Sequence, residues 1–476
     1  MKKYTSFSEI KKDIKQGNTT CNELVAHYLE NINKNEHLNI YLEVYGEEAL
    51  SKAQKVDAKI TDGTEGKLAG MVIGIKDVLC YAEHGLQGGS RILDGFESQF
   101  TGTAVQRLID EDAIIIGRQN CDEFAMGSSN ENSAFGPTLN GIDNERVPGG
   151  SSGASAVAVQ MDTCLIALGS DTGGSVRQPA AFCGIVGMKP TYSRISRHGL
   201  ISYASSFDCI GIFSNNIDDN ALVLEVMAGK DDYDSTVSTE PVPSYSHLLE
   251  LDKPNGLKIA YITETLESEG LNEEIKARTL SALEGLKNDG YIVEAVDFPF
   301  LKYLLPTYYI LTTAESSSNL SRYDGVKYGM RSKNTTDLES MYKKTRSEGF
   351  GKEVKRRIML GTFVLSASYY DAYYTKAQKV RRIIREKTKQ LLNEYDFIVL
   401  PTTPTTAFKI GEHSKDPLEM YLADLFTVQS SVVGTPSISI PNGEDKNGLP
   451  IGLQIITDDF KEAELFAFSK HLMKEH

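Results

Sequence analysis

The sequence lacks long apolar runs, paired-cysteine motifs and an excess of positive charge. Nowhere do 18 consecutive apolar residues occur, which argues against a membrane-spanning helix. The first residues, MKKYTSFSEIKKDIKQG, contain no apolar stretch of signal-peptide length. The six cysteines show no CxxC spacing, and several lie within apolar runs, as buried reduced thiols do. We therefore expect a cytoplasmic protein without an export signal.

Basic residues are outnumbered: the chain has 50 Lys and Arg against 65 Asp and Glu, a formal net charge of −15 at pH 7. Binding a phosphate backbone requires a basic surface that displaces counterions. The composition therefore argues against a chain that binds nucleic acid without a partner. With 476 residues, 40% of them hydrophobic, the chain can bury a large core.

Short apolar runs bounded by Gly, Asp or Pro predict the strands of a sheet. They begin near residue 70 and have the length of buried strands, and helical patterns such as TAVQRLIDED fall between them. The predicted strands are residues 71–75, 113–117, 163–169, 257–262, 291–296 and 396–401. This alternation predicts an α/β fold with a largely parallel sheet.

The sequence contains no internal repeat and no low-complexity linker, so we expect one continuous domain over residues 1–476. Within it we distinguish a helical segment, 1–60, and a core of about 70–230 that carries the glycine-rich loops. The remainder, about 230–476, supplies the rest of the sheet and the pocket. A separately moving segment between 230 and 350 stays an alternative.

The stretch VPGGSSGASAVAV contains the GxSxG pattern of a hydrolase nucleophile elbow, from Gly149 to Gly153, with Ser151 as the nucleophile. That elbow follows a buried strand, whereas the residues before this loop are polar and end in a proline. A phosphate-binding loop also fails, because no Lys-Ser or Lys-Thr follows the glycines. The structural alternative is a turn in which Ser151 or Ser152 caps a helix.

A second loop, SDTGGSVRQPAAF, follows a predicted strand and makes a reactive serine more plausible. Gly173 and Gly174 allow backbone N–H groups to turn toward a common point, directly before Ser175. Clustered amides of this kind can form an oxyanion hole. A helix over 152–161 would rise about 15 Å, and the returning strand covers a comparable length. Ser151 and Ser175 are therefore expected at one rim of the sheet.

A base must accept the serine proton. Only His84 and His198 lie near glycine-rich segments, and neither has a distinctive setting. The segment MVIGIKDVLC instead places Lys76 at the end of an apolar strand, where burial would lower the pKa of its ammonium. If that strand runs parallel to the strand before Ser175, Lys76 reaches the same rim. The alternative is a lysine that is solvated or paired with Asp77.

The stretch from PGGSSGASAV to GMKPT, residues 148–191, resembles the amidase signature, and GIKD, residues 74–77, resembles the lysine motif of that family. Ala154 stands where many members have glycine, a mild change at the first turn of a helix. Through motifs such as DEFAMGSS, SYYDAYY and NGLPIGLQII, the wider chain resembles the glutamine-hydrolysing subunits of tRNA-dependent amidotransferases. The resemblance implies an α/β fold with a large mixed, mostly parallel β-sheet covered by helices on both faces.

The resemblance also implies a catalytic triad. Ser175 would attack the side-chain amide carbon of glutamine, and Ser151, held by a cis peptide bond after Gly150, would relay its proton to a neutral Lys76. Asp171 and Arg177 would brace the loop around Ser175 rather than react. The oxyanion would be held by the backbone N–H groups of Thr172, Gly173 and Gly174.

Glutamine recognition requires one group for the α-carboxylate and another for the α-ammonium. In GKEVKRRIM we favour Arg357 over Arg356 for the carboxylate, by a bidentate contact. In MYLADLFT we favour Asp424 for the ammonium, and in LPTYYI we expect Tyr308 to close the pocket. The structural alternatives are a solvated face for the KRR run, a helix cap for Asp424 and a core aromatic for Tyr308.

Partners follow from the same resemblance. In those enzymes a B subunit binds the misacylated Glu-tRNA(Gln), activates it with ATP and Mg²⁺ and receives ammonia through a channel, while a C subunit wraps the pair. We therefore expect no cofactor or metal in this chain, and contact with tRNA mainly through the B subunit. Three alternatives remain: a stand-alone amidase with another small amide substrate, a Ser-His-Asp esterase that uses Ser151, and a non-catalytic scaffold.

Overall fold

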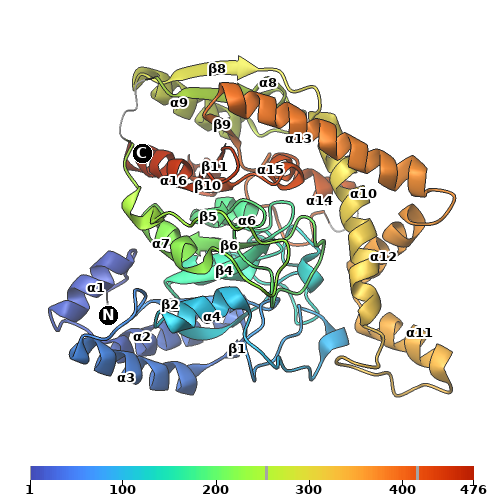
Figure 1. Cartoon of the computed structure of the whole chain (residues 1–476), viewed down its shortest axis with the longest axis horizontal. Helices are drawn as coiled ribbons and strands as arrows, with labels where there is room; N and C mark the ends of the chain where they lie inside the picture. Colours follow the sequence, from blue (N-terminus) through green and yellow to red (C-terminus); the bar gives the residue numbers. More distant parts are fainter. Residues whose placement is uncertain (1, 252–255, 414–416, 476) are drawn as a thin grey trace.

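The computed structural model describes residues 2–251, 256–413 and 417–475, and one large sheet forms its centre. Its strands are β1 (Tyr41–Val44), β2 (Val72–Lys76), β3 (Ile114–Gln119), β4 (Ile166–Asp171), β5 (Val186–Lys189), β6 (Cys209–Ser214), β7 (Lys258–Ile262), β8 (Ile292–Val296), β9 (Phe397–Pro401), β10 (Ser437–Glu444) and β11 (Pro450–Ile456). Their order in the sheet is β1-β3-β2-β4-β6-β5-β10-β11-β9-β7-β8. Figure 1 shows this order from β1 near the bottom to β8 at the top.

Helices lie on both sides of the sheet in this view (Figure 1). They are α1 (Phe7–Lys15), α2 (Cys21–Lys34), α3 (Gly46–Asp62), α4 (Thr103–Asp110), α5 (Gly153–Gln160), α6 (Arg177–Cys183), α7 (Ile217–Met227), α8 (Thr263–Leu266), α9 (Glu273–Asn288), α10 (Leu301–Asn319), α11 (Leu338–Gly349), α12 (Lys352–Val364), α13 (Lys376–Glu394), α14 (Pro417–Leu422), α15 (Val428–Val433) and α16 (Glu462–Glu475). The predicted α/β fold with a large mixed sheet is confirmed. Over the described ranges, no helix combines the length and apolar character that a membrane crossing requires.

The parallel share of the sheet is smaller than predicted. All six predicted strands form, and they account for the parallel pairs, namely β2 with β3 and β4, and β7 with β8 and β9. The other described neighbours pair antiparallel. Each of these pairs includes a strand that was not predicted. In the β10–β11 hairpin, for example, a short turn suffices to connect antiparallel neighbours, so the chain shows no crossover helix between them.

One hydrophobic cluster extends from Tyr4 to Leu472 and packs around this sheet. The N-terminal segment is not purely helical, because β1 pairs with β3 at the sheet edge. A small second cluster contains Val147, Phe182, Ala407 and Phe408. The described parts of all three predicted segments therefore contribute to the same sheet and core.

The sheet places the two glycine-rich loops beside the end of β2. Strands β2 and β4 run parallel, so Lys76 and Asp171, their last residues, lie at the same edge. Helix α5 contacts both strands, and every residue from Gly153 to Val159 is buried. Small side chains allow this close packing, and the helix brings its N-terminal loop to the edge where β4 ends.

Candidate active site

Lys76 is completely buried, and hydroxyl groups surround its amine. Its Nζ lies within hydrogen-bonding distance of the Oγ atoms of Ser151 (2.7 Å), Ser152 (2.8 Å) and Ser170 (2.9 Å). Desolvation by burial lowers the pKa of Lys76 to about 8, because a dry site disfavours the charged ammonium. No carboxylate forms an ion pair with Lys76 in the part of the chain that the structure describes. The amine can therefore be neutral near physiological pH and accept a proton from a hydroxyl.

The alternative in which Asp77 pairs with Lys76 is wrong. Asp77 Oδ1 accepts from Arg118 Nη1 (2.6 Å) and from the backbone N–H of Gln87 (2.9 Å), and Oδ2 accepts from the N–H of Gly89 (2.8 Å). Successive side chains of an extended chain point to opposite sides. Asp77 is thus turned away from the amine and is satisfied by its own partners.

Hydrogen bonds to other segments hold the loop before α5 at Gly150 and at Ser151. The Gly150–Ser151 peptide bond is cis, as the resemblance implied. Gly150 N–H donates to Gln178 Oε1 (2.8 Å), and Asp122 N–H donates to the carbonyl of Ser151 (3.1 Å). A Cβ at residue 150 would collide with Asp122 and with the backbone of Ser129. Only glycine fits before Ser151.

Helix capping does not explain these serines. Ser152 occupies the N-cap position of α5 but makes no side-chain capping bond. Its hydroxyl instead donates to the carbonyl of Ser170 (3.2 Å) and accepts from Lys76. Neither histidine serves Ser151: the side chain of His84 contacts Ala82 and Glu48, and that of His198 contacts Thr103. The helix-cap and Ser-His-Asp alternatives are therefore wrong.

Ser175 lies next to this loop, with 8% of its surface exposed. Its carbonyl accepts from Ser152 N–H (3.3 Å), so the two loops meet at one rim of the sheet, as predicted. Its hydroxyl forms no hydrogen bond with another described residue, whereas that of Ser151 is bonded to Lys76. Ser175 thus has a hydroxyl available to a ligand.

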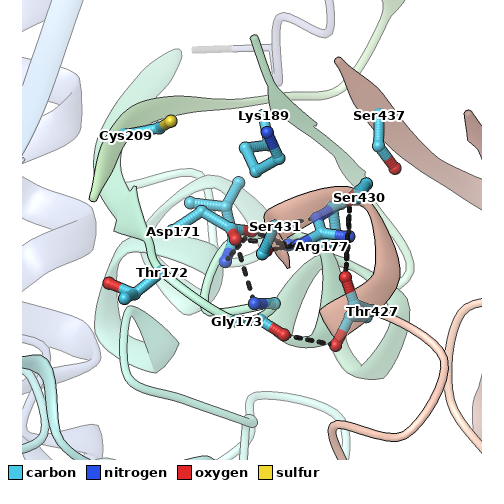
Figure 2. Close-up of polar contacts among 12 residues, drawn as sticks. Asp171, Thr172, Gly173, Arg177, Lys189, Cys209, Thr427, Ser430, Ser431 and Ser437 are labelled. Atoms are coloured by element: carbon cyan, nitrogen blue, oxygen red, sulfur yellow. Dashed lines mark hydrogen bonds and ion pairs between the residues drawn. The ribbon is translucent and has the colours of Figure 1, made fainter. Parts of the chain in front are cut away.

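An ion pair braces the loop that carries Ser175 (Figure 2). Asp171 and Arg177 are completely buried and lie 2.8 Å apart. Asp171 Oδ1 also accepts from Gly174 N–H (2.9 Å), while Arg177 Nη1 donates to the carbonyl of Thr427 (2.7 Å). Thr427 Oγ1 in turn donates to the carbonyl of Gly173 (2.6 Å). These groups hold the loop in shape, as expected.

The oxyanion prediction needs one correction. Gly174 N–H is already bonded to Asp171 Oδ1 (2.9 Å). By contrast, the N–H groups of Thr172, Gly173 and Ser175 donate to no acceptor among the described residues. Motif reasoning missed the amide of Ser175, although a nucleophile's own N–H is a common oxyanion donor. The amides of Thr172, Gly173 and Ser175 are therefore open to a ligand, whereas that of Gly174 is occupied.

Arg357, on α12, is buried and does not belong to a solvated face. Its Nε donates to Glu353 (2.9 Å) and its Nη1 to the hydroxyl of Tyr203 (2.8 Å), while Nη2 has no hydrogen bond to a described residue. Arg356 also pairs with Glu353, but its side chain is 36% exposed. The surrounding rings, with centroids 5.4 to 5.6 Å from the guanidinium carbon, are Tyr203, Tyr309 and Tyr421.

Asp424 is buried beside this arginine and is not a helix cap. Its Oδ2 accepts from Ser128 Oγ (2.9 Å) and from the hydroxyl of Tyr309 (3.0 Å). At the start of α15, by contrast, only the backbone carbonyl of Asp424 accepts from Val428 N–H. Burial raises the pKa of Asp424 to about 7, so the carboxylate is ionised above that pH and could hold a cation.

Tyr308 connects this pocket to the loop of Ser175. A Cβ built on Gly173 would lie 2.5 Å from the Tyr308 hydroxyl, which shows how closely the ring covers the loop. The ring also packs edge-to-face on Phe207 and Tyr309. Tyr308 is therefore a core aromatic that also packs against the loop of Ser175. Together with Tyr309, it connects Gly173 to Asp424.

An open cavity of about 310 Å³ adjoins these groups. Its walls include Ser129, Glu353, Arg357 and Tyr421. Ser128, between the lining residues Gly127 and Ser129, binds Asp424, and Ser129 adjoins Gly150, so the cavity lies close to Asp424 and to the loop of Ser151. Across the described ranges, no group of three or more His, Cys, Asp and Glu side chains is arranged to hold a metal ion.

Sequence reasoning missed several partners of the predicted residues. Glu353 had a usable signal, since it precedes Arg357 by four positions and shares its helix face. Ser170 lies within the glycine-rich segment but resembles an ordinary strand residue. Tyr203 had no local signal, because its contact with Arg357 spans 154 positions.

Comparisons with known proteins identify the same family as the sequence motifs do. The profile of the family described as Amidase matches residues 23–466. The A subunit of glutamyl-tRNA(Gln) amidotransferase from Chlorobium limicola is 50% identical over 471 residues, which is 99% of each chain. The solved structure of the corresponding A subunit from Thermotoga maritima is 39% identical, with a TM-score of 0.78 over 94% of this chain and 90% of that one. A peptide amidase from Stenotrophomonas maltophilia is 26% identical, with a TM-score of 0.80 over 98% and 96%.

Proposed function

The chain belongs to the Amidase family, and we propose that it is the glutamine-hydrolysing subunit of a glutamyl-tRNA(Gln) amidotransferase. One observation carries this proposal: a buried lysine bonded to Ser151 adjoins the loop of Ser175, and a cavity lined by the buried Arg357 lies next to Ser128, which binds the buried carboxylate of Asp424. Glutamine has the matching groups, an amide at one end and an α-carboxylate and α-ammonium at the other. The similarity to the A subunits of these enzymes over almost the full length supports the same substrate.

In the first step, the Ser175 hydroxyl attacks the side-chain amide carbon of glutamine. Its proton passes to Ser151 Oγ while the proton of Ser151 passes to neutral Lys76, which makes the weak nucleophile reactive. The amide oxygen becomes an oxyanion. The N–H groups of Thr172, Gly173 and Ser175 would stabilise this charge.

In the second step, the tetrahedral intermediate collapses and its C–N bond breaks. The proton held by Lys76 returns through Ser151 to the leaving nitrogen, and ammonia departs. A glutamyl ester remains on Ser175. Water then attacks this ester with the help of the same relay, which releases glutamate and restores the Ser175 hydroxyl.

Substrate binding would use the two buried charges. Arg357 has an unbonded Nη2 and would bind the α-carboxylate, while Glu353 and Tyr203 fix its orientation. Asp424 would bind the α-ammonium through its Oδ1, because Oδ2 already has two donors. Tyr308 would close the pocket over the side chain of glutamine.

The ammonia would be used by partner subunits. A B subunit would bind Glu-tRNA(Gln), activate it with ATP and Mg²⁺ and receive the ammonia, and a C subunit would wrap the pair. This chain would then act in the cytoplasm without a cofactor of its own. Its net charge of −15 agrees with an arrangement in which the partner binds the RNA.

The rate of glutamine hydrolysis is expected to rise with pH through about 8. Lys76 must be neutral to accept a proton, and burial lowers its pKa to about 8. Below that pH the ammonium form dominates, so kcat/KM should fall by about tenfold for each pH unit. Ammonia release measured from about pH 6 to 9 at constant ionic strength checks this expectation.

Asp424 adds a second effect of the same sign to this pH profile. Burial raises its pKa to about 7, so protonation below that pH would remove the partner of the α-ammonium and raise KM. Asp424→Asn should lose this lower transition and keep the one of Lys76. A wild-type profile that stays flat from about pH 6 to 9 would contradict both assignments.

Substitution of Arg357 tests the amino-acid clamp and hence the substrate. Arg357→Lys is expected to raise KM for glutamine on the order of 100-fold, because a single ammonium cannot keep the contacts to Glu353 and Tyr203 and also bind the carboxylate as Nη2 would. Hydrolysis of butyramide, which lacks both α-groups, should change little. Steady-state ammonia release with both substrates measures the difference.

Arg356→Lys is the matched control, because it lies on the same helix but its side chain is 36% exposed. Its KM for glutamine should stay within about twofold of the wild type. Equal losses on glutamine and butyramide in Arg357→Lys, or a wild type that prefers amides without α-groups, would favour a stand-alone amidase instead.

A further inference from the structure

Asp208, directly before β6, is a buried carboxylate that the proposed mechanism does not use. Its Oδ1 accepts from Thr172 Oγ1 (2.7 Å), and its Oδ2 accepts from the N–H groups of Tyr203 (2.9 Å) and Ala204 (3.0 Å). No described Lys, Arg or His forms an ion pair with it. Burying a carboxylate without a counter-ion is costly, and these hydrogen bonds offset part of that cost.

The first of these contacts reaches the oxyanion loop. Thr172 directly follows Asp171, at the start of that loop, and its N–H is one of the amides with no described acceptor. Its hydroxyl is bonded to Asp208, which holds the Thr172 side chain in one orientation and so restrains the backbone that carries it. The carboxylate therefore helps to determine where the Thr172 amide points.

The second contact reaches the arginine. Tyr203, whose backbone N–H donates to Asp208, accepts from Arg357 Nη1 at its own hydroxyl (2.8 Å) and donates to Thr312 Oγ1 (3.0 Å). A single buried side chain thus lies between the residue that holds Arg357 and the start of the oxyanion loop.

A parallel contact joins the same segments. Phe207, the neighbour of Asp208, packs edge-to-face on Tyr308, with ring centroids 5.8 Å apart. Tyr308 covers Gly173. Residues 203–208 therefore contact the oxyanion loop both through a hydrogen bond and through an aromatic ring, and they contact Arg357 through Tyr203.

We infer that Asp208 is a positioning residue that links occupation of the Arg357 site to the alignment of the Thr172 amide. The inference rests on the proposed function. When the α-carboxylate of glutamine holds Arg357, the connected Tyr203 and Asp208 are held in place, and the Thr172 amide is aligned for the oxyanion. Binding energy from the remote end of the substrate is thereby used at the reacting carbon.

Asp208→Asn tests the link, because the amide has the same size but replaces one acceptor oxygen by a donor. We expect kcat for glutamine to fall by about 30-fold or more, as for partial loss of an oxyanion donor, with KM changed by less than about threefold. Hydrolysis of butyramide should change little, since this substrate never occupies Arg357. A purely structural role would lower both activities together.

Thr172→Val provides a second variant that keeps the backbone amide and removes only the hydroxyl. It should lower kcat for glutamine as Asp208→Asn does, and the double variant should be about as active as the less active of the two single variants, as for residues acting through one contact. Thr406→Val is the matched control. Its hydroxyl donates to Asp445 Oδ2 (3.0 Å), at the β10–β11 hairpin, and its loss should leave kcat unchanged.

Thermal melting establishes that each variant is folded, and Thr172→Val decides the matter if Asp208→Asn does not fold. Unchanged kcat for glutamine in both variants, or equal losses on glutamine and butyramide, would overturn the inference alone. A wild-type chain that releases no ammonia from glutamine would overturn the proposed function, and the inference with it.

Discussion

Ser175→Ala is expected to lower the rate of glutamine hydrolysis by about 10⁴-fold or more, as removal of a catalytic nucleophile does in other serine hydrolases. The physical reason is the loss of the covalent intermediate. Ser175 has a hydroxyl without a described partner, beside open backbone amides, so no neighbouring group is positioned to replace it. Ammonia release by the purified variant measures the effect.

Ser155→Ala serves as its control. Ser155 is a buried serine of the neighbouring helix α5, and its hydroxyl donates to the carbonyl of Leu168 (3.1 Å), away from Lys76. This variant should retain most of the activity. A Ser175→Ala protein that is folded and active would remove Ser175 from the mechanism.

The covalent intermediate provides a direct measurement of the same prediction. Wild-type protein quenched during turnover should carry one glutamyl unit on Ser175. Cleavage after Arg146 and Arg177 leaves Ser151 and Ser175 on one peptide, so fragmentation is needed to assign the adduct. An adduct on Ser151 would contradict the relay role of that residue.

Lys76→Ala is expected to abolish activity almost as completely, with a loss on the order of 10³-fold or more. Lys76 is the common partner of three serine hydroxyls, and no other described base contacts Ser151. Without it the proton of Ser175 has no acceptor at the end of the relay. The measurement is again ammonia release, at a pH above about 8, where wild-type Lys76 is mostly neutral.

Lys189 offers a matched control for this substitution. It is also a completely buried lysine at the end of a strand, β5, but its Nζ donates only to the carbonyl of Pro190 (3.0 Å) among described groups. Figure 2 shows it above the Asp171–Arg177 pair. Lys189→Ala should retain most of the activity if the protein stays folded. Similar losses in both variants would indicate destabilisation rather than removal of a base.

Much of this site could be predicted because its residues lie next to local signals. Lys76 follows an apolar strand, and Ser151 and Ser175 lie in glycine-rich turns that adjoin a helix and a strand of comparable length. Strand ends and glycine turns depend on near neighbours along the chain. Their meeting at one rim then follows from the parallel pairing of β2 and β4.

Other features depended on contacts between distant segments. The antiparallel centre of the sheet arises from β5, β6, β10 and β11, whose pairing joins the two halves of the chain. Local patterns cannot show which strand a segment pairs with, because the same pattern of apolar residues is compatible with parallel and with antiparallel pairing. The parallel share was therefore overestimated.

By itself, then, the sequence determined the reactive residue types and their positions at strand ends and turns. Only the tertiary structure decided which N–H groups are open, because Asp171 takes the amide of Gly174 and leaves that of Ser175. It also decided that Arg357 is buried while Arg356 is partly exposed, since Tyr203 reaches it across 154 positions. Hydrogen-bond partners and burial are properties of the packed chain, and no local pattern encodes them.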